Sequence, residues 1–592
     1  MINDRIEQLR KIMKEKGIFA YIIPSADYHQ SEYVGKFFKG REFISGFTGS
    51  AGTVVITDEK AILWTDGRYF LQAEKELNKT CVELYKMGEE GVPTTFEYIE
   101  KEVPVGAKIG FDGRTISAAI GEDLEKKLAK KDVTISYEDD LLDEVWIERP
   151  ALSDAKAFLL DVKYSGEDFK SKIARVREEM KTMGATTHIL TSLDDIAWLF
   201  NIRGRDIAYN PVVLSYAVVS LDKAILFVDE NKLNEEILNS FDGEVVEIKD
   251  YFEIDEFVKT VEKEEVVLVD NNKINYTILK NIPEGVKVIN AMNPTTVFKA
   301  AKNPVEIENT KKAHIRDGVA VAKFMYWLKN NIGKTEITEI SAAEKMTELR
   351  KEQGNFIEPS FASIAGYAAN GAIVHYSATK ESNQTLQPKG LFLLDSGGQY
   401  YDGTTDITRT FAVGPLTEEE KSNFTSVCRA MVRLSQAKFL YGVNGYYLDI
   451  LARGILWEQN LNYNHGTGHG VGHVLNVHEG PNGVRCDNRN SATLEEGMIT
   501  TNEPGFYKAG SHGIRIENEM LCKKGVKNEF GQFMEFEPIT IAPIDLDAID
   551  VSLMKEDEKE YLNSYHKMVF ETLSPFLTEE EVTWLKEYTR AI

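Results

Sequence analysis

The histidines of this chain are concentrated in one short glycine-rich segment. Four of the ten histidines lie between positions 465 and 478, and glycines separate the first three of them. Imidazole is the commonest metal-binding side chain and titrates near neutral pH. Glycine has no Cβ, so the backbone can approach a ligand closely. The segment is therefore predicted to form the floor of an active site, with a polar surface loop as the alternative. Its histidines are His465, His469, His473 and His478.

Five carboxylates occupy strand-like settings in the same part of the chain. Asp395 directly follows the apolar run 390–394. Glu503 lies in the segment 498–506, where a predicted strand ends at a proline. Two further segments, 404–411 and 513–519, alternate between polar and apolar residues, which predicts strands with one polar face each. The polar face of the first carries Thr404, Asp406 and Thr408, and that of the second carries Arg515, Glu517 and Glu519.

These acids favour a divalent metal site. A carboxylate at the end of an apolar strand is costly to bury unless a cation or a hydrogen-bond network compensates its charge. Oxygen ligands with a single imidazole suit manganese, iron, cobalt or zinc better than a cysteine-rich structural zinc site. Two ions are consistent with the pattern, because carboxylates can bridge ions roughly 3.5–4 Å apart. Exposed acids at strand ends and ordinary salt bridges, such as Arg515 with Glu517, are the alternative.

The elements that precede this region are predicted to be duplicated. An apolar pattern at helical spacing over residues 6–13 is followed by an apolar strand at 19–23. The same order of helix and strand recurs after residue 172. The heptapeptides KAILWTD (60–66) and KAILFVD (223–229) occupy equivalent places in the two copies. We therefore expect two domains of one αβ fold.

Linker composition places the domain boundaries. The segments 148–156 and 292–304 are the best linker candidates, and Asn303 followed by Pro304 and Glu306 predicts a helix start. A long helix is expected to run from there towards Trp327, and the residues after Asp545 are also predicted to be helical. The expected domains are 1–150, 151–302 and 303–592.

Composition limits the function classes. The 592 residues carry a net charge of −25, which argues against nucleic acid or an anionic membrane as partner. The four cysteines are scattered without a CxxC pair, as in reduced intracellular chains. The N-terminus is charged rather than a signal peptide, and no apolar run reaches the roughly 18 residues needed to span a bilayer. A cytoplasmic protein is expected.

The ordered set Asp395, Asp406, His469, Glu503 and Glu517 resembles the five-ligand dinuclear site of the pita-bread (M24) metallopeptidases. The surrounding sequence is most similar to the aminopeptidase P (Xaa-Pro aminopeptidase) group in its long three-domain form. The segments that carry this resemblance are VHY (374–376), DSGGQYYDGTTDITRT (395–410), HGTGHGVGHVLNVHEGP (465–481), TNEPGFY (501–507), GIRIENE (513–519), SGFTGSAGT (45–53) and LWTDGRYF (63–70).

The resemblance implies an α/β (α+β) chain in which a C-terminal pita-bread catalytic domain follows two related creatinase-like αβ domains. It implies two divalent ions, with manganese as the usual cofactor and zinc or cobalt as alternatives. Asp395 would be a terminal ligand of one ion, His469 and Glu503 terminal ligands of the other, and Asp406 and Glu517 the bridges. The expected substrates are peptides with proline in second position, and the expected assembly is a homodimer.

The resemblance also implies the chemistry. A hydroxide bridging the two ions would attack the carbonyl before proline, and Glu503 would take the proton of the water and deliver it to the leaving nitrogen. Arg515 would orient the carboxylates. His375, His465 and His478 match the non-ligand histidines that line the proline pocket, hydrogen-bond the substrate and shuttle protons. His473 and His512 match no functional position, and His473 is expected to lie in solvent.

Several alternatives remain open from the sequence. Prolidase would use the same ligands but cleave only dipeptides. Methionine aminopeptidase normally lacks the N-terminal domains. Non-catalytic peptide-binding members of the fold typically lose the ligands, whereas all five positions here carry competent side chains. The chain contains no HExxH, Walker A or GxGxxG motif, so a thermolysin-like zinc site and a nucleotide cofactor are not supported.

Overall fold

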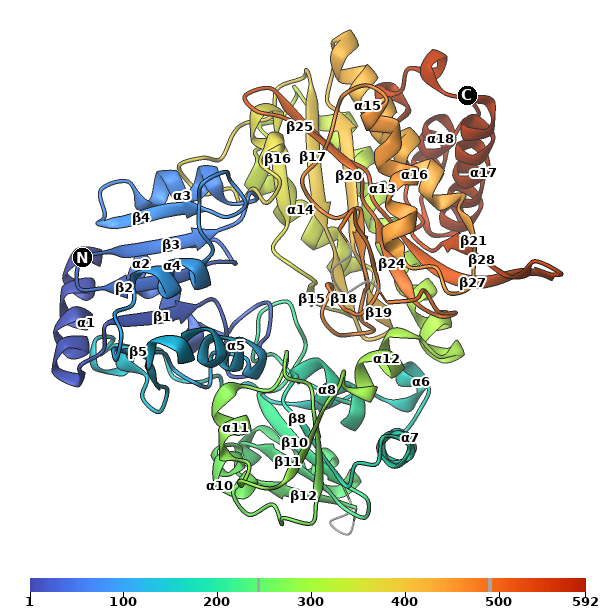
Figure 1. Ribbon diagram of the computed structural model, residues 1–592. Helices are drawn as coiled ribbons and strands as arrows, with labels where there is room; N and C mark the ends of the chain where they lie inside the picture. Colours follow the sequence, from blue (N-terminus) through green and yellow to red (C-terminus); the bar gives the residue numbers. More distant parts are fainter. Residues whose placement is uncertain (242–244, 488–491) are drawn as a thin grey trace. The chain divides into compact units, whose positions relative to one another are not determined.

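The computed structural model describes residues 1–241, 245–487 and 492–592 (Figure 1). Contacts within the chain divide it into two compact units. The first comprises Met1–Leu160 and Glu167–Thr295, and the second comprises Asp161–Gly166 and Thr296–Ile592. The three expected domain limits stay a prediction.

The first unit begins with the predicted helix and strand. Helix α1 (Ile2–Lys16) buries Ile6, Leu9 and Met13 on one face. It ends at Gly17, whose φ of 67° lies in the left-handed region that glycine adopts without steric cost. The chain then enters β1 of a six-stranded sheet with the order β4-β3-β2-β1-β5-β6. The strands are β1 (Ala20–Pro24), β2 (Thr53–Thr57), β3 (Ala61–Thr65), β4 (Val82–Lys86), β5 (Lys108–Gly110) and β6 (Thr134–Ser136).

A second sheet repeats the first strand for strand. Its order is β12-β11-β10-β8-β13-β14. In both sheets the two central pairings have the same directions: β1 is antiparallel to β2 and parallel to β5, and β8 is antiparallel to β10 and parallel to β13. The duplicated αβ unit is therefore confirmed. The second copy contains α7 (Phe169–Met183), β8 (Thr187–Leu190), β10 (Ser215–Ser220), β11 (Ala224–Val228), β12 (Val246–Lys249), β13 (Val266–Val269) and β14 (Lys287–Asn290).

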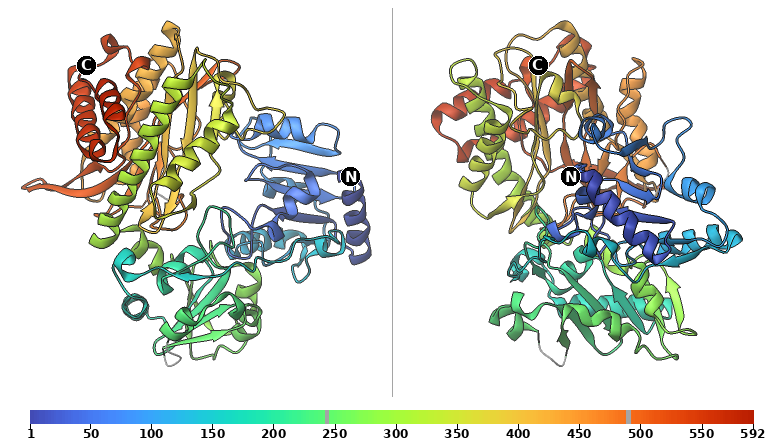
Figure 2. Two further views of the ribbon diagram at one scale, coloured as in Figure 1. Left: turned by 180° about the vertical axis from the view of Figure 1, so that it is seen from behind. Right: turned by 90° about the vertical axis from the view of Figure 1, so that its left-hand side faces the viewer.

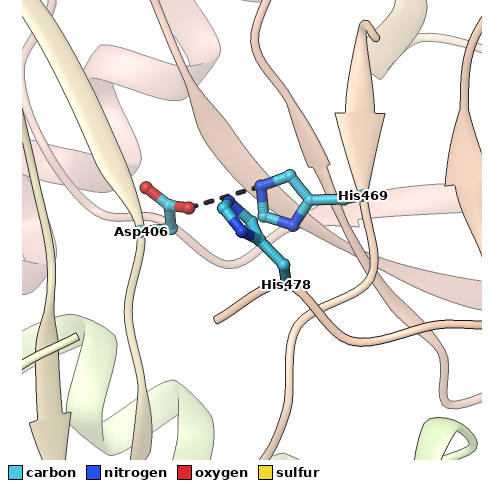
Figure 3. Close-up of side chains that lie close together, drawn as sticks. All are labelled: Asp406, His469 and His478. Carbon is cyan, nitrogen blue, oxygen red and sulfur yellow. Dashed lines mark ion pairs between the residues drawn. The ribbon is translucent and has the colours of Figure 1, made fainter. Parts of the chain in front are cut away.

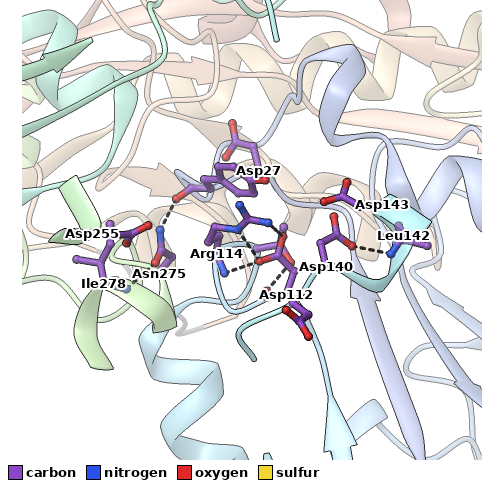
Figure 4. Close-up of polar contacts among 12 residues, drawn as sticks. Asp27, Asp112, Arg114, Asp140, Leu142, Asp143, Asp255, Asn275 and Ile278 are labelled. Atoms are coloured by element: carbon purple, nitrogen blue, oxygen red, sulfur yellow. Dashed lines mark hydrogen bonds and ion pairs between the residues drawn. The ribbon is translucent and has the colours of Figure 1, made fainter. Parts of the chain in front are cut away.

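The two copies contact one another through equivalent segments. The Ala118 N–H donates to the Ile274 carbonyl, and the Tyr276 N–H donates to the Ile116 carbonyl, both at 2.8 Å. Beside this exchange lies a polar cluster in which Arg114 pairs with Asp112 at 2.9 Å (Figure 4). The first unit is thus held together across its two sheets by backbone hydrogen bonds, and the ion pair of Lys280 with Glu125 at 2.9 Å also joins the two copies.

The second unit places strands between two layers of helices. Its central sheet is antiparallel, with the order β16-β17-β20. Helices α13 and α14 share a hydrophobic core with these strands, and α15 and α16 lie on the opposite side (Figure 2). A longer sheet has the order β21-β28-β27-β24. The bounds are α13 (Pro304–Asn331), α14 (Glu339–Glu352), β16 (Ile364–Tyr367), β17 (Leu391–Ser396), β20 (Ile407–Ala412), α15 (Glu418–Ser435), β21 (Lys438–Leu440), α16 (Gly445–Trp457), β24 (Ile499–Asn502), β27 (Asn518–Asn528) and β28 (Gly531–Pro538).

The predicted start of α13 is confirmed. The Asn303 side chain accepts the backbone N–H groups of Val305 and Glu306, and the Glu306 carboxylate accepts the Asn303 N–H. The expected C-terminal helices are also present, as α17 (Glu556–Leu573) and α18 (Glu579–Tyr588).

The four cysteines Cys81, Cys428, Cys486 and Cys522 are free, as expected. Over the described residues, no helix is both long enough and apolar enough to cross a membrane.

Candidate metal centre

Three carboxylates meet where neighbouring strands end or begin. Asp395 lies in β17, Asp406 lies between β19 (Gly403–Thr404) and β20, and Glu517 lies between β26 (His512–Arg515) and β27. Asp395 is opposite Thr408 in the β17–β20 register, and the Glu517 N–H donates to the Thr408 carbonyl at 3.1 Å. All three carboxylates are buried.

A second group of strands brings in the remaining predicted ligands. His469 belongs to β22 (Gly468–His469), which pairs with β23 (Gly483–Val484). Glu503 follows β24 directly and precedes Pro504, as predicted. A Cβ at Gly468 would lie 1.9 Å from the Thr501 carbonyl oxygen, so only glycine lets the histidine loop pack this closely on β24.

The donor atoms of these side chains lie close together. His469 Nε2 is 3.4 Å from Asp406 Oδ2 and 3.6 Å from Glu503 Oε1. Figure 3 shows Asp406, His469 and His478 facing one another. Donor atoms fall within 4.8 Å of one another in three overlapping groups, which are Asp406 with His469 and His478, His469 with Glu503 and Glu517, and Asp395 with Asp406 and Glu517.

The electrostatics of this cluster fit divalent cations. Burial, with mutual repulsion of the carboxylates, raises the pKa values of Asp406 and Glu517 well above their usual range. Burial also raises the pKa of Glu503, to about 7. Asp395 Oδ1 is buried and has no hydrogen-bond partner among the described residues. Several carboxylates crowded away from water need compensating positive charge, which two divalent ions would supply.

His469 is held in the tautomer that a metal requires. Its Nδ1 lies 2.9 Å from the Gly470 carbonyl oxygen, so Nδ1 carries the proton and donates it there. The lone pair of Nε2 then faces the carboxylates of Asp406 and Glu503.

A hydrogen-bonded chain supports Asp395 from the other side. Arg515 Nη2 donates to Asp395 Oδ2 at 2.6 Å, and its Nη1 donates to the Tyr507 hydroxyl at 2.6 Å. That hydroxyl lies 2.9 Å from His465 Nε2. Burial, reinforced by the nearby Arg515 charge, lowers the pKa of His465 to about 3, so this histidine is neutral. Arg515 therefore forms its ion pair with Asp395, and not with Glu517 as in the salt-bridge alternative.

The other two predicted histidines also lie at the site. His375 follows the short helix η6 (Ala368–Ala372) and is near enough to His465 to contribute to the lowered pKa of that histidine. The His478 ring packs edge-on against the His469 ring, with centroids 4.4 Å apart.

Known proteins match this chain along its whole length. A chain from Coprinopsis cinerea named as a probable Xaa-Pro aminopeptidase P is 41% identical, and the alignment covers 99% of this chain and 98% of that one. The Xaa-Pro aminopeptidase 1 of Dictyostelium discoideum is 39% identical, with 100% and 97% covered. Sequence models match the creatinase/prolidase N-terminal domain at 5–145 and 148–306, metallopeptidase family M24 at 308–524 and the C-terminal region of peptidase M24 at 532–592. The chain belongs to the Xaa-Pro aminopeptidases of metallopeptidase family M24.

A solved structure has the same fold. The X-prolyl aminopeptidase of Caenorhabditis elegans, described as a cytosolic enzyme with a dinuclear active site, superimposes with a TM-score of 0.96. It is 34% identical to this M24 chain, and each chain is covered completely. The chain is therefore a metal-dependent hydrolase built from two creatinase-type domains and an M24 domain.

One prediction for the histidine loop of this M24 chain is wrong. His473 is only 3% exposed. Its Nδ1 lies 3.0 Å from the Thr310 hydroxyl on α13, and its Nε2 lies 3.0 Å from the Tyr164 carbonyl oxygen on α6 (Val162–Ser165). The loop folds back against these two helices, so protein partners replace the expected solvent. His512 is buried as well, against Asn423, and belongs to none of the three donor groups.

The two alternating segments are also less regular than predicted. The first stops at residue 404 and resumes at 407, and the second stops at 515 and resumes at 518. At the first break the Asp406 N–H donates to the Glu519 carboxylate at 2.7 Å instead of to a neighbouring strand. A side-chain acceptor thus replaces strand pairing at Asp406, whereas at the second break the Glu517 N–H donates to the Thr408 backbone carbonyl.

Sequence analysis missed the buried polar residues behind the site. The second oxygen of Glu519 lies 3.1 Å from His314 Nε2, and both side chains are fully buried. Asp317 on α13 accepts two hydrogen bonds from Arg350 on α14, and Arg350 also donates to the Ser396 carbonyl beside Asp395. The available signal was a charged residue, Asp317, among the apolar positions of the helix predicted to run from Asn303, because such a residue requires a buried partner.

Proposed function

We propose that this chain removes the N-terminal residue from peptides whose second residue is proline, using two divalent cations, most readily Mn²⁺. The observation that carries the proposal is the overlap of the three donor groups, any two of which share Asp406, His469 or Glu517. Oxygen ligands with one imidazole nitrogen suit Mn²⁺.

Asp406, His469 and Glu517 each belong to two donor groups. His469 has only Nε2 to offer, because its Nδ1 bonds the Gly470 carbonyl, whereas each carboxylate has two oxygens. Asp406 and Glu517 are therefore the better candidates for shared ligands. Asp395 belongs only to the group without histidine, and Glu503 only to the group with His469 and Glu517. We therefore assign Asp395 to one ion, and His469 and Glu503 to the other. When bound, the two ions would lower the pKa of a water molecule and polarise the peptide carbonyl.

Proton transfer and substrate binding are assigned to Glu503 and to the three histidines that are not metal ligands. The prolyl nitrogen has no hydrogen of its own, so it must gain a proton to leave as an amine. Glu503 can take the proton of the attacking water and transfer it to this nitrogen. His465 is fixed by Tyr507 and is neutral, so it can exchange hydrogen bonds with the substrate without carrying charge. His375 and His478 are assigned to the same substrate pocket.

Metal titration of stripped protein tests the ligand assignment. We expect the wild-type chain to bind two Mn²⁺ ions by isothermal titration calorimetry. His469→Ala and Glu503→Gln should each lose one of the two binding steps and the peptidase activity, because each side chain serves one ion. Two intact binding steps with full activity in either variant would contradict the assignment.

We also propose a cytosolic homodimer, the location being that described for the C. elegans relative. Helix α16 leaves Tyr447, Ile450 and Trp457 exposed at helical spacing, and this apolar face is a candidate for self-association. Sedimentation velocity should give a dimer that Ile450→Glu weakens; a wild-type monomer at micromolar concentration would contradict the proposal.

A further inference from the structure

Arg409 is a buried guanidinium without a carboxylate partner among the described residues. It lies on β20 and is 2% exposed. Its hydrogen bonds go to the carbonyls of Pro543 (2.9 Å), Thr408 (2.9 Å), Glu517 (2.5 Å) and Ala542 (3.0 Å), to Asn518 Oδ1 (2.8 Å) and to the Tyr565 hydroxyl (3.1 Å). These acceptors satisfy all five guanidinium N–H groups, which lysine could not do with three donors.

One side of Arg409 holds the backbone around Glu517. The Thr408 hydroxyl donates to Glu517 Oε2 at 2.8 Å, and the Thr408 carbonyl accepts the Glu517 N–H at 3.1 Å. Arg409 donates to this same Thr408 carbonyl and to the carbonyl of Glu517 itself. The guanidinium therefore fixes both the residue that orients the Glu517 carboxylate and the backbone that carries it.

The other side of Arg409 reaches the C-terminal region. Its acceptors there are two successive carbonyls, those of Ala542 and Pro543, and the hydroxyl of Tyr565 on α17. The Tyr565 hydroxyl lies 2.8 Å from the Ala542 carbonyl and 3.0 Å from the Thr540 carbonyl, so it clamps the same segment. Helix α17 packs against α13 and α15, which makes it a firm support (Figure 1).

A buried cation that lacks an anionic partner is costly, so its retention calls for a role. We infer that the C-terminal region, acting through Tyr565 and Arg409, positions Glu517 as a ligand shared by both metal ions. This inference rests on the proposed function, because it needs ions at Glu517. Arg409 and Tyr565 are then positioning residues, and α17 supports the metal ligand Glu517 through them.

The test compares two tyrosines of one helix in the full-length chain. Tyr565→Phe removes the hydroxyl that contacts Arg409 and keeps the ring. Tyr561→Phe is the matched control, one turn earlier on α17, because its hydroxyl is not among the partners of Arg409. Mn²⁺ binding to stripped protein is measured by calorimetry, and thermal unfolding is measured in chelator.

We expect Tyr565→Phe to weaken Mn²⁺ binding several-fold and the control to bind like wild type. Arg409→Lys, where it folds, should weaken binding on the order of 10–100-fold, the range typical of outer-shell metal partners. Both binding steps should weaken, because Glu517 belongs to two donor groups.

Unchanged Mn²⁺ binding in Tyr565→Phe would overturn the inference, whether or not its unfolding temperature in chelator falls. An equal loss in the Tyr561→Phe control would overturn it too. A wild-type chain that binds no Mn²⁺ would overturn the proposed function and this inference with it, whereas normal wild-type binding with an unaffected Tyr565→Phe would overturn the inference alone.

Discussion

At the scale of single residues, the four histidines of one loop have four different environments. His465 is neutral beside Tyr507, and His469 faces carboxylates. His473 is enclosed by two helices, and His478 packs on the ring of His469. Residue type therefore indicates metal chemistry for the segment, while the role of each imidazole depends on the partner that the fold supplies.

His473→Ala should destabilise the protein without removing metal. The substitution leaves the Thr310 hydroxyl and the Tyr164 carbonyl without their buried partner, which costs about 1–3 kcal/mol. We expect a lower unfolding temperature with Mn²⁺ stoichiometry unchanged. An unaltered unfolding temperature would contradict this prediction and would mean that the buried hydrogen bonds of His473 add nothing to stability.

His566 should make stability depend on pH. It is fully buried on α17, where Nε2 accepts the Ile544 N–H at 3.1 Å, and burial lowers its pKa to about 3. An unfolded histidine titrates near pH 6.5. As pH falls from about 6.5 towards 3, the unfolded chain gains a proton that the folded chain does not, so folded stability falls by about 1.4 kcal/mol per pH unit from this residue.

The matching comparison is His566→Gln, with both proteins in chelator. The variant should lose stability less steeply than wild type between pH 6 and pH 4, roughly the window set by the two pKa values. Parallel curves in chemical denaturation would show that His566 is not kept neutral by folding.

At the scale of elements, periodic patterns predicted what local sequence controls. Neighbouring residues determine the buried face of α1, the N-cap of α13 and the end of β24 before Glu503 and Pro504. They do not determine the strand break at Asp406, because its N–H donates to the Glu519 carboxylate, more than a hundred residues away in the chain. Alternation alone cannot report a partner so distant in sequence.

Removing one partner of the buried ion pair between Asp317 on α13 and Arg350 on α14 should strongly destabilise the protein. Asp317→Ala leaves Arg350 buried without its carboxylate, which costs about 3–5 kcal/mol. Glu348→Ala, which removes the exposed Lys345–Glu348 pair on the same helix α14, is the control and should cost about 0–1 kcal/mol. Equal losses in thermal unfolding would mean that the buried pair carries no special weight.

At the scale of the whole molecule, the duplication was visible in the sequence and its interlocking was not. Two similar heptapeptides were enough to predict two copies of one fold. The hydrogen bonds that Ile116 and Ala118 exchange with Ile274 and Tyr276 join segments about 158 residues apart. Hydrogen bonds between segments so distant in sequence cannot be predicted from the local periodicity of apolar residues.

The chemistry of the molecule follows from its oxygen-rich centre and from its family. Carboxylates from β17, from both breaks between strands and from the end of β24 converge with the imidazole of His469, beside which His478 lies. The relatives that match this chain along its full length are named for cleavage before proline. Metal and substrate requirements are therefore best measured together on one preparation.

The central claim is tested most directly by assaying chelator-stripped protein on Xaa-Pro-Pro, Xaa-Ala-Pro and Xaa-Pro peptides, with and without added Mn²⁺. Metal-restored release of the first residue from Xaa-Pro-Pro, and not from Xaa-Ala-Pro, is the predicted result. Cleavage of the Xaa-Pro dipeptide alone would indicate a prolidase, and no cleavage with any divalent metal by folded protein would contradict the account.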